Sequence, residues 1–495
     1  MEALRTNRFR RKPTNTHRSN HLLSISLMAL FFLLLFFFSN NYSITSLFFF
    51  PNSLKTSQCL NPKTLQTLNG ENFLWYAPHS GFSNQLSEFR NAVLMAAILN
   101  RTLIVPPVLD HHAVVLGSCP KFRVSDPREL RFAVWNHAIE LIRGRRYVSM
   151  ADVIDLSALV SHSAVRVIDF RNFVPLFCDI DVNNFCVNNS EMDDSLLKKL
   201  RQCGSRLSGY NTDINDCVYA VEEDCRTTVW TFQKDGENGA LDSFQPDEQL
   251  KKKKNISFVR RRKDVYDTLG PHSRADVATV LSFGSLFTSP YKGSESYIDI
   301  HEAPRDQKIQ SLIKEIEFLP FVREISDAGK EYALRTIKSP FLCAQLRLLD
   351  GQFKNHWRGT FQALKQKVDS LRQKESLPLH IFVMTDLPMG NWSGTYLGDL
   401  ANEPDSIKLF LLSEEDKLIR KTAKKVVDAS HGWKFGASYN DGIKEDCQRH
   451  QRLPDILLHV EESVCSCASL GFVGTAGSTI ADSIEMMRKK EICSH

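Results

Sequence analysis

One short segment between residues 73 and 107 constrains the fold of this 495-residue chain most, because strand and helix patterns alternate in it. Phe73–Tyr76 is an apolar run typical of a strand, and the loop Pro78–Ser83 follows it. Gln85–Leu99 carries apolar residues at helical spacing, and Thr102–Val105 has a strand pattern closed by two prolines. Strand, turn, helix and strand in this order predict the opening of a doubly wound α/β domain.

A second series of alternating patterns occupies the C-terminal part of the chain. It predicts strands at Phe341–Leu348, His380–Met384, Ile407–Leu412 and Leu470–Val473, and helices at Ile309–Phe318, Ser326–Lys338, Phe361–Arg372, Leu457–Ser463 and Thr479–Arg488. Together the two series predict two Rossmann-like domains, residues 70–320 and 321–495, that face each other across a cleft where nucleotides bind. The stretch around 235–300 begins charged and poor in apolar residues, and is predicted to be an exposed insertion in the first domain.

The N-terminus combines a basic tail with an apolar run. Residues 1–20 hold six basic residues and one acidic residue, and Leu22–Phe38 is uncharged. A helix over these 17 residues rises about 25 Å, which is enough for a thin membrane. We therefore predict a cytosolic tail (1–20), a transmembrane signal anchor (21–39) and a stem (40–69), as in a single-pass type II protein of the Golgi or endoplasmic reticulum. A cleaved signal peptide is the alternative, and in either case the bulk of the chain is lumenal.

Glycosylation signals and cysteines agree with a lumenal location. Five N-x-[ST] sequons occur, at Asn41, Asn100, Asn188, Asn255 and Asn391. Twelve cysteines are present, five of them within 178–225, and such clusters form disulfides in an oxidising compartment. The pairing is left open by the sequence. The net charge of +5 arises in the basic tail, and the rest of the chain has equal numbers of basic and acidic residues, so no nucleic-acid partner is expected.

The loop before the first predicted helix is the first candidate binding site. Gly81, Phe82, Ser83 and Asn84 lie where free backbone N–H groups meet the positive end of the helix, which suits a diphosphate. The alternative is a plain turn in which Asn84 caps the helix.

Three further candidates lie at the ends of strands in the second series. Arg347 follows a strand and can bind a diphosphate with two parallel hydrogen bonds, or it is a surface residue. Asp386 ends the next strand and binds a base or ribose, or caps a turn. Gly474, Ser478 and Thr479 lie between a strand and a helix, and form either an anion site or an ordinary helix cap.

These motifs resemble those of the GDP-fucose protein O-fucosyltransferases. The first segment is similar to a G-x-F-x-N-Q loop, here Gly-Phe-Ser-Asn-Gln at 81–85, followed by N-R-T-L-x-x-P-P ending at Pro107. The strand before Arg347 is similar to an H-L-R motif, with Gln345 in place of histidine. The last segment is similar to G-x-x-x-S-T-F-S, with Ile480 and Ala481 in place of phenylalanine and serine.

The resemblance implies a GT-B type fold and inverting, metal-independent transfer of fucose from GDP-fucose to a hydroxyl of a protein or glycan. It implies no cofactor or metal. Arg347 and Asn84 are implied as catalytic residues. The implied donor-binding residues are Gly81, Phe82, Ser83, Asn84, Gln345, Arg347, Asp386, Gly474, Ser478 and Thr479. No catalytic base is assigned, because helical spacing turns Glu88 away from the loop.

Other readings of the sequence stay open at this stage. The same fold can use another donor, such as UDP-rhamnose for cell-wall polysaccharide, or bind a sugar nucleotide or glycan without turnover. Asp179 and Asp181 have the D-x-D spacing of metal-dependent transferases, but lie between cysteines without a clear strand. The same segment is a poor calcium loop, because it lacks the glycine and glutamate that an EF-hand needs.

Overall fold

The structure is a computed structural model. It describes residues 71–110, 114, 127–144, 146–161, 165–180, 194–209, 217–221, 228–231, 258–286, 307–349, 351–375, 377–435, 453 and 455–494, all within the compact unit Ser57–His495. The predicted tail, anchor and stem (1–69) and the sequons Asn41, Asn188 and Asn255 lie outside these residues. Within the described residues, no helix combines the length and the apolar character needed to cross a membrane. Asn100 and Asn391 are exposed.

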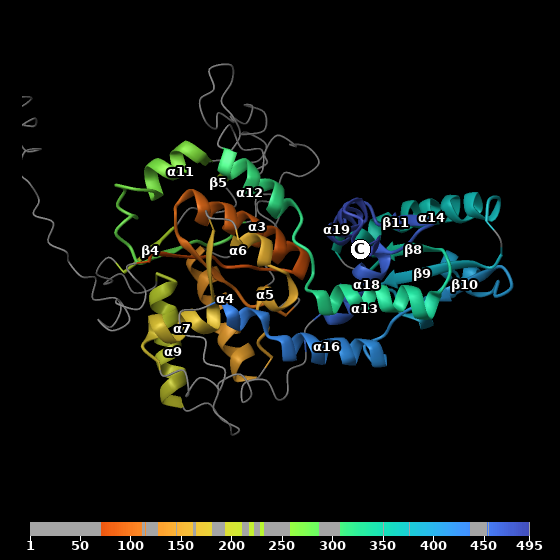
Figure 1. The fold of residues 1–495 in the computed structure, drawn as a ribbon, viewed down its shortest axis with the longest axis horizontal. Helices are drawn as coiled ribbons and strands as arrows, with labels where there is room; N and C mark the ends of the chain where they lie inside the picture. Colours follow the sequence, from red (N-terminus) through yellow and green to blue (C-terminus); the bar gives the residue numbers. More distant parts are fainter. Residues whose placement is uncertain are drawn as a thin grey trace, which may run out of the picture. The chain divides into compact units, whose positions relative to one another are not determined.

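The first half is coloured from orange to green in Figure 1. It is built on a five-stranded sheet with the order β3-β2-β1-β7-β4. Its strands are β1 (Phe73–Trp75), β2 (Thr102–Val105), β3 (Arg166–Asp169), β4 (Val218–Ala220) and β7 (Val280–Ser282). All neighbouring strands are parallel. The direction of winding changes between β1 and β7, and in open α/β sheets ligands bind at such a point.

Apolar side chains on both faces of this sheet are covered by helices. Along β1, Leu74 packs into one core cluster, and Phe73 and Trp75 pack into another, because successive side chains of a strand point to opposite faces. The helices of this half are α3 (Phe82–Ile98), α4 (Pro127–Arg143), α5 (Met150–Val153), α6 (Ser157–Ser161), α7 (Phe170–Cys178), α9 (Asp194–Leu207), α11 (Arg262–Leu269) and α12 (Gln307–Glu317). A separate pair of parallel strands is formed by β5 (Thr228–Thr231) and β6 (Phe258–Arg261).

The second half contains a four-stranded parallel sheet with the order β10-β9-β8-β11. Its strands are β8 (Phe341–Leu346), β9 (Leu379–Thr385), β10 (Ile407–Phe410) and β11 (Gly471–Gly474). The direction of winding changes between β8 and β11. The helices are α13 (Arg323–Tyr332), which continues as a π-helical turn (Ala333–Ile337), α14 (Trp357–Arg372), α15 (Tyr396–Ala401), α16 (Lys417–Ala429), α18 (Ile456–Ser466) and α19 (Thr479–Lys489).

The α/β class and the strands and helices predicted in both series are present. One part of the predicted organisation is wrong, since Val280–Ser282 lies inside the range 235–300 predicted as an insertion. These residues form β7, which pairs between β1 and β4 in the interior of the first sheet. A three-residue strand is too short to show a sequence period, so its burial depends on contacts that only the fold provides.

Residues 430–435 of the second half pack into the first half through buried polar groups. The Gly432 N–H donates to Asp152 Oδ1 at 2.7 Å, and the Asp169 N–H donates to the Phe435 carbonyl at 2.8 Å. The Arg171 side chain donates to Asp169 at 2.9 Å and to Asp152 at 3.3 Å. The Asp152 carboxylate therefore contacts both Arg171 and the 430–435 segment. Asp169 contacts Arg171 through its carboxylate and the 430–435 segment through its backbone N–H.

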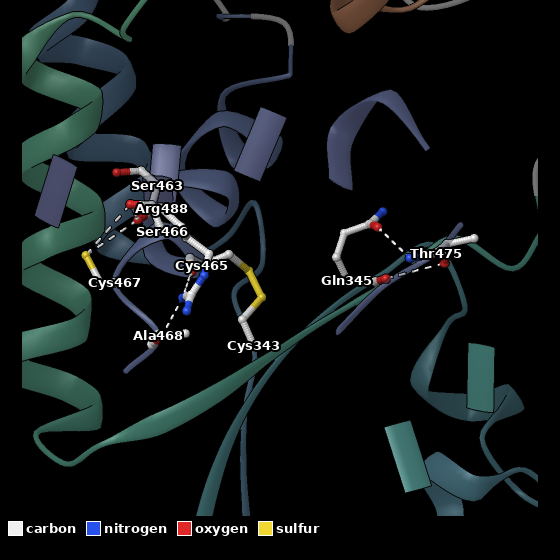
Figure 2. The surroundings of a disulfide bond; sticks show 9 residues. All are labelled: Cys343, Gln345, Ser463, Cys465, Ser466, Cys467, Ala468, Thr475 and Arg488. Atoms are coloured by element: carbon white, nitrogen blue, oxygen red, sulfur yellow. Dashed lines mark hydrogen bonds between the residues drawn. A yellow bond between two sulfur atoms is a disulfide. The ribbon is translucent and has the colours of Figure 1, made fainter. Parts of the chain in front are cut away.

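Three disulfides between described residues confirm that cysteines pair. They join Cys178 to Cys203, Cys343 to Cys465, and Cys467 to Cys493. Among the described residues no cysteine is free. Cys465 and Cys467 are two positions apart, yet they bond to different elements: Cys343 lies in β8, and Cys493 lies beyond α19. Figure 2 shows the bond between β8 and α18.

Candidate active site

The loop after β1 ends at Gly81, the N-cap residue of α3. Asn84 lies within the first turn and donates its N–H to the Gly81 carbonyl at 2.9 Å, so it is not the cap. The N–H groups of Phe82 and Ser83 have no acceptor within the helix, as at every helix N-terminus. They form the positive end of α3 that the sequence predicted as a diphosphate site.

The Phe82 side chain is buried in the core instead of lining the loop surface. Its ring centroid lies 4.2 Å from that of His459 in α18 and 6.4 Å from that of Phe321. Burial lowers the pKa of His459 to about 3, so this imidazole is neutral at physiological pH. The start of α3 is thereby packed against a helix of the second half, and only the backbone of Phe82 is left to meet a donor.

Gln85 shapes the same loop. Its side-chain amide donates to the Ser80 carbonyl at 2.8 Å and to the Leu109 carbonyl at 3.1 Å, and its oxygen accepts from the Leu109 N–H at 2.9 Å. Gln85 is buried, so it holds the loop in place and does not bind ligand. The structure thus gives a physical role to the glutamine of the N-Q motif.

Arg347 directly follows the C-terminal end of β8. The direction of winding of the second sheet changes next to this strand, between β8 and β11. Its N–H donates to the Thr475 hydroxyl at 2.9 Å, and this hydroxyl donates to the Gln345 carbonyl at 3.3 Å. The Gln345 side-chain oxygen accepts from the Thr475 N–H at 3.2 Å, and Figure 2 shows the two residues facing each other. Thr475, which the sequence analysis missed, therefore joins the ends of β8 and β11. The side-chain oxygen of Gln345 is therefore engaged in joining the two strand ends.

The Arg347 guanidinium is half-buried and lies over the Phe353 ring, with its central carbon 5.1 Å from the ring centroid. A cation over an aromatic face is attracted by the negative ring centre. Phe353 therefore restricts the orientation of the guanidinium, although nothing in the sequence pattern distinguished it.

Asp386 shapes the segment after Arg347. Its two carboxylate oxygens accept the N–H groups of Leu348 and Leu349, at 2.7 and 3.0 Å. The carboxylate is exposed, so it retains free acceptor positions. The turn-capping role is present in the structure, and the role in donor binding stays a prediction.

Ser478 is the N-cap residue of α19, and Thr479 is its first residue. Ser478 is fully buried, and its Oγ has no hydrogen-bond partner in the described part of the chain. A buried hydroxyl without a partner is costly, which favours a ligand at this position. At Gly474 a Cβ atom would lie 2.7 Å from the Ala481 Cβ, so this glycine allows β11 and α19 to approach each other.

The predicted residues therefore form two groups. Gln345, Arg347, Asp386, Gly474, Ser478 and Thr479 lie at one edge of the second sheet, linked through Thr475 and the Leu348–Leu349 backbone. Gly81–Asn84 begin α3, which contacts α19 and, through Phe82, α18. Asp179 of the D-x-D pair ends α7 in a left-handed conformation, whereas Asp181 lies outside the described residues.

Replacing Thr475 with valine is expected to destabilise the site without creating a cavity. The change removes the hydroxyl that accepts the Arg347 N–H at 2.9 Å, and removing one partner of such a part-buried hydrogen bond costs about 1–3 kcal/mol. Urea denaturation gives the free energy of unfolding, and Thr475→Ser, which keeps the hydroxyl, is the matched control. An unfolding curve that is the same for valine and serine would contradict this role of the hydroxyl.

Comparison with known proteins gives one close relative. No model of a known protein family matches the chain. O-fucosyltransferase 30 of Arabidopsis thaliana is 56% identical over 481 residues, which cover 96% of this chain and 94% of the relative. Crystal structures of POFUT1 with GDP and with GDP-fucose align at 13% and 12% identity, each with a TM-score of 0.38, over 85% of this chain and 95% of POFUT1. Because the Arabidopsis relative shares more than half of its residues over nearly the full length of both proteins, the chain belongs to the O-fucosyltransferase family.

Proposed function

We propose that this protein transfers fucose from GDP-fucose to a hydroxyl group of a protein or glycan acceptor. The name of the Arabidopsis relative supports the reaction. The observation that carries the proposal is the edge of the second sheet, where Arg347 is fixed by Thr475 and Phe353 and the buried Ser478 Oγ lacks a partner in the described part of the chain. A cation and a helix N-terminus together are the usual protein ligands of a diphosphate.

In this proposal the two sheets are the two halves of a GT-B arrangement, with the donor between them. The first turns of α3 and α19 offer N–H groups to the diphosphate, and Ser478 donates its hydroxyl. Arg347 neutralises the charge that develops on the diphosphate as the sugar–phosphate bond breaks, so the reaction needs no metal ion. The acceptor hydroxyl attacks the opposite face of the sugar, and the configuration at its anomeric carbon is inverted.

The protein would work in the lumen of the Golgi or endoplasmic reticulum, held by a type II anchor at residues 21–39. Its disulfides support an oxidising compartment, because such bonds are rare in the cytosol. The exposed position of Asn391 is compatible with glycosylation there.

A choice among nucleotide sugars tests the proposal. The full-length protein is titrated with GDP-fucose, GDP-mannose and UDP-rhamnose, and binding is measured by calorimetry. We expect GDP-fucose to bind at least tenfold more tightly than the others and to be the one donor from which nucleotide is released. Preference for UDP-rhamnose would overturn the donor assignment, and tight binding of GDP-fucose without release of GDP in the presence of acceptor glycoproteins would overturn the enzyme assignment.

A further inference from the structure

Four polar side chains, two of them in the loop between β1 and α3, form a continuous series of hydrogen bonds. Ser80 Oγ lies 3.0 Å from His79 Nδ1, and His79 Nε2 lies 2.9 Å from Ser285 Oγ. The Ser285 hydroxyl donates to Glu88 Oε1 at 2.8 Å. His79, Ser285 and Glu88 are buried, whereas Ser80 is half-buried at the end of the chain next to the loop surface. These groups connect a fully buried carboxylate to the edge of the proposed donor site.

The chain of side chains lies where the winding of the first sheet changes direction. His79 and Ser80 follow β1, and Ser285 follows β7, the two strands between which the reversal occurs. Parallel strands end at the same edge of a sheet, and this is the edge at which open α/β proteins bind their ligands. The position is therefore suited to chemistry on a bound substrate.

The hydrogen bonds give the chain a direction. Glu88 accepts the His79 N–H at 2.9 Å, the Ser285 hydroxyl and the Leu286 N–H, so the carboxylate is an acceptor at every one of these contacts. Because Ser285 donates its proton to Glu88, its oxygen can accept from His79 Nε2–H, which also lies 3.2 Å from Glu88 Oε1. His79 Nδ1 then carries the lone pair, which faces the Ser80 hydroxyl. In this series of hydrogen bonds, Ser80, His79 and Ser285 each donate a proton to the next group, in the direction from Ser80 to Glu88.

Ser80 is held in a backbone conformation that serine rarely adopts. Its φ angle is +64°, in the left-handed region. The Ser80 N–H donates to the Val114 carbonyl at 3.0 Å, and its carbonyl accepts from Gln85. Such conformations persist where the surroundings fix them, and they cluster at functional sites. Here the surroundings fix the hydroxyl next to Gly81, where α3 begins.

We propose that Ser80, His79, Ser285 and Glu88 form a proton relay that deprotonates the acceptor hydroxyl during transfer. The relay rests on the proposed function and adds the base that the sequence left unassigned. The expectation that Glu88 points away from the loop is wrong, because its carboxylate accepts the N–H of His79 in that loop. Ser80 is the residue that touches the acceptor, and the other three act through it.

The relay balances protons and charge. The acceptor oxygen forms a bond to the anomeric carbon of fucose, and the bond from that carbon to the phosphate oxygen breaks, so its electron pair leaves with GDP. The acceptor proton passes to Ser80 Oγ, whose own proton passes to His79 Nδ1. The Nε2 proton of His79 moves to Ser285, and the Ser285 proton moves to Glu88. The net change is one neutral carboxylic acid at Glu88, which releases its proton to solvent by the reverse path after GDP departs.

The charges around Glu88 suit a base that works near neutral pH. Burial raises the pKa of Glu88 to about 8 and lowers the pKa of His79 to about 4. Burial, and after it the charge of Glu88, raises the pKa of Tyr76 well above its ordinary value, so Tyr76 is neutral, and on α12 the charge of Glu317 acts on Arg90. A base is most effective when its pKa lies near the working pH. Because only ionised Glu88 accepts a proton, activity should rise about tenfold per pH unit below about 8 and level off above it.

The test uses the full-length protein with GDP-fucose as donor and water as the acceptor, and measures GDP release from pH 6 to 9. Ser80→Ala and Glu88→Gln are each expected to lower the rate at pH 8 by about 100-fold and to flatten its rise with pH. Affinity for GDP-fucose, from calorimetry, should stay within threefold of wild type. Ser87→Ala, on the same helix and outside the relay, is the matched control and should keep the wild-type rate and pH profile.

The outcomes separate the relay from the proposed function. If wild type binds GDP-fucose and Ser80→Ala keeps the wild-type rate and its rise with pH, the relay is wrong and the proposed function stands. If wild type binds no GDP-fucose, the proposed function fails, and the relay fails with it. Melting temperatures are recorded at each pH, and Ser80→Ala, which removes a half-buried hydroxyl, decides the case if Glu88→Gln does not fold.

Discussion

Replacing Arg347 with alanine is expected to lower kcat/KM for GDP-fucose by about 10³-fold, the largest effect on activity that we predict. In the proposed mechanism this guanidinium balances the charge that appears on the leaving diphosphate, and loss of one such donor costs about 10²–10³ in rate. The backbone of Arg347 is held by Thr475, so the side chain can be removed while the strand end stays in place. Steady-state GDP release measures the effect.

Two further variants define the cause of this loss. Arg347→Lys keeps the positive charge but loses the planar fork and its fit to Phe353, so we expect it to recover only part of the activity. Arg335→Ala removes an exposed arginine of the π-helical turn that pairs with Glu331, and should leave activity unchanged. Activity of Arg347→Ala within threefold of wild type would show that the diphosphate is neutralised elsewhere.

Replacing both Cys343 and Cys465 with alanine is expected to lower the free energy of unfolding by about 5 kcal/mol. A disulfide restricts the unfolded chain, and the restriction grows with the loop that it closes. These cysteines are 122 positions apart and join β8 to α18, the strand before Arg347 to the helix that carries His459. Urea denaturation of the oxidised protein and of the double variant measures the difference.

The Cys467–Cys493 pair is the matched control, because it also joins the C-terminal helices but spans only 26 positions. The same argument gives a loss of about 3.5 kcal/mol when both of these cysteines are replaced. A larger loss for the short loop than for the long one would contradict the argument from chain entropy. The comparison uses the free energy of unfolding alone, because the loop between Cys467 and Cys493 contains Gly474, Ser478 and Thr479 of the predicted donor site.

The sequence predicted those parts of the fold whose pattern is local. Phe341–Leu346 is a continuous apolar run and was identified as a strand, and the Gln85–Leu99 stripe identified most of α3. Val280–Ser282 was misassigned, because three residues cannot show a period and their burial depends on β1 and β4. The helix Lys417–Ala429 was also missed among its many charged residues.

The same distinction holds at the candidate site. Arg347 and Ser478 lie in recognisable motifs at strand and helix ends, so they were singled out. Thr475 lies between two of the predicted residues but has no motif position of its own. Ser285 is 206 positions from His79, and its role follows only from the pairing of β1 with β7. Residues that act through a partner distant in the chain leave no signal in a single sequence.

The packing of residues 430–435 into the first half has a consequence for how the protein is made. Gly432 lies 280 positions after Asp152, whose carboxylate it caps. A nascent chain that has emerged only as far as α12 must therefore hold Asp152, Asp169 and Arg171 without their final cover. The first half acquires its finished interior late in synthesis, so the two halves mature together and not one after the other.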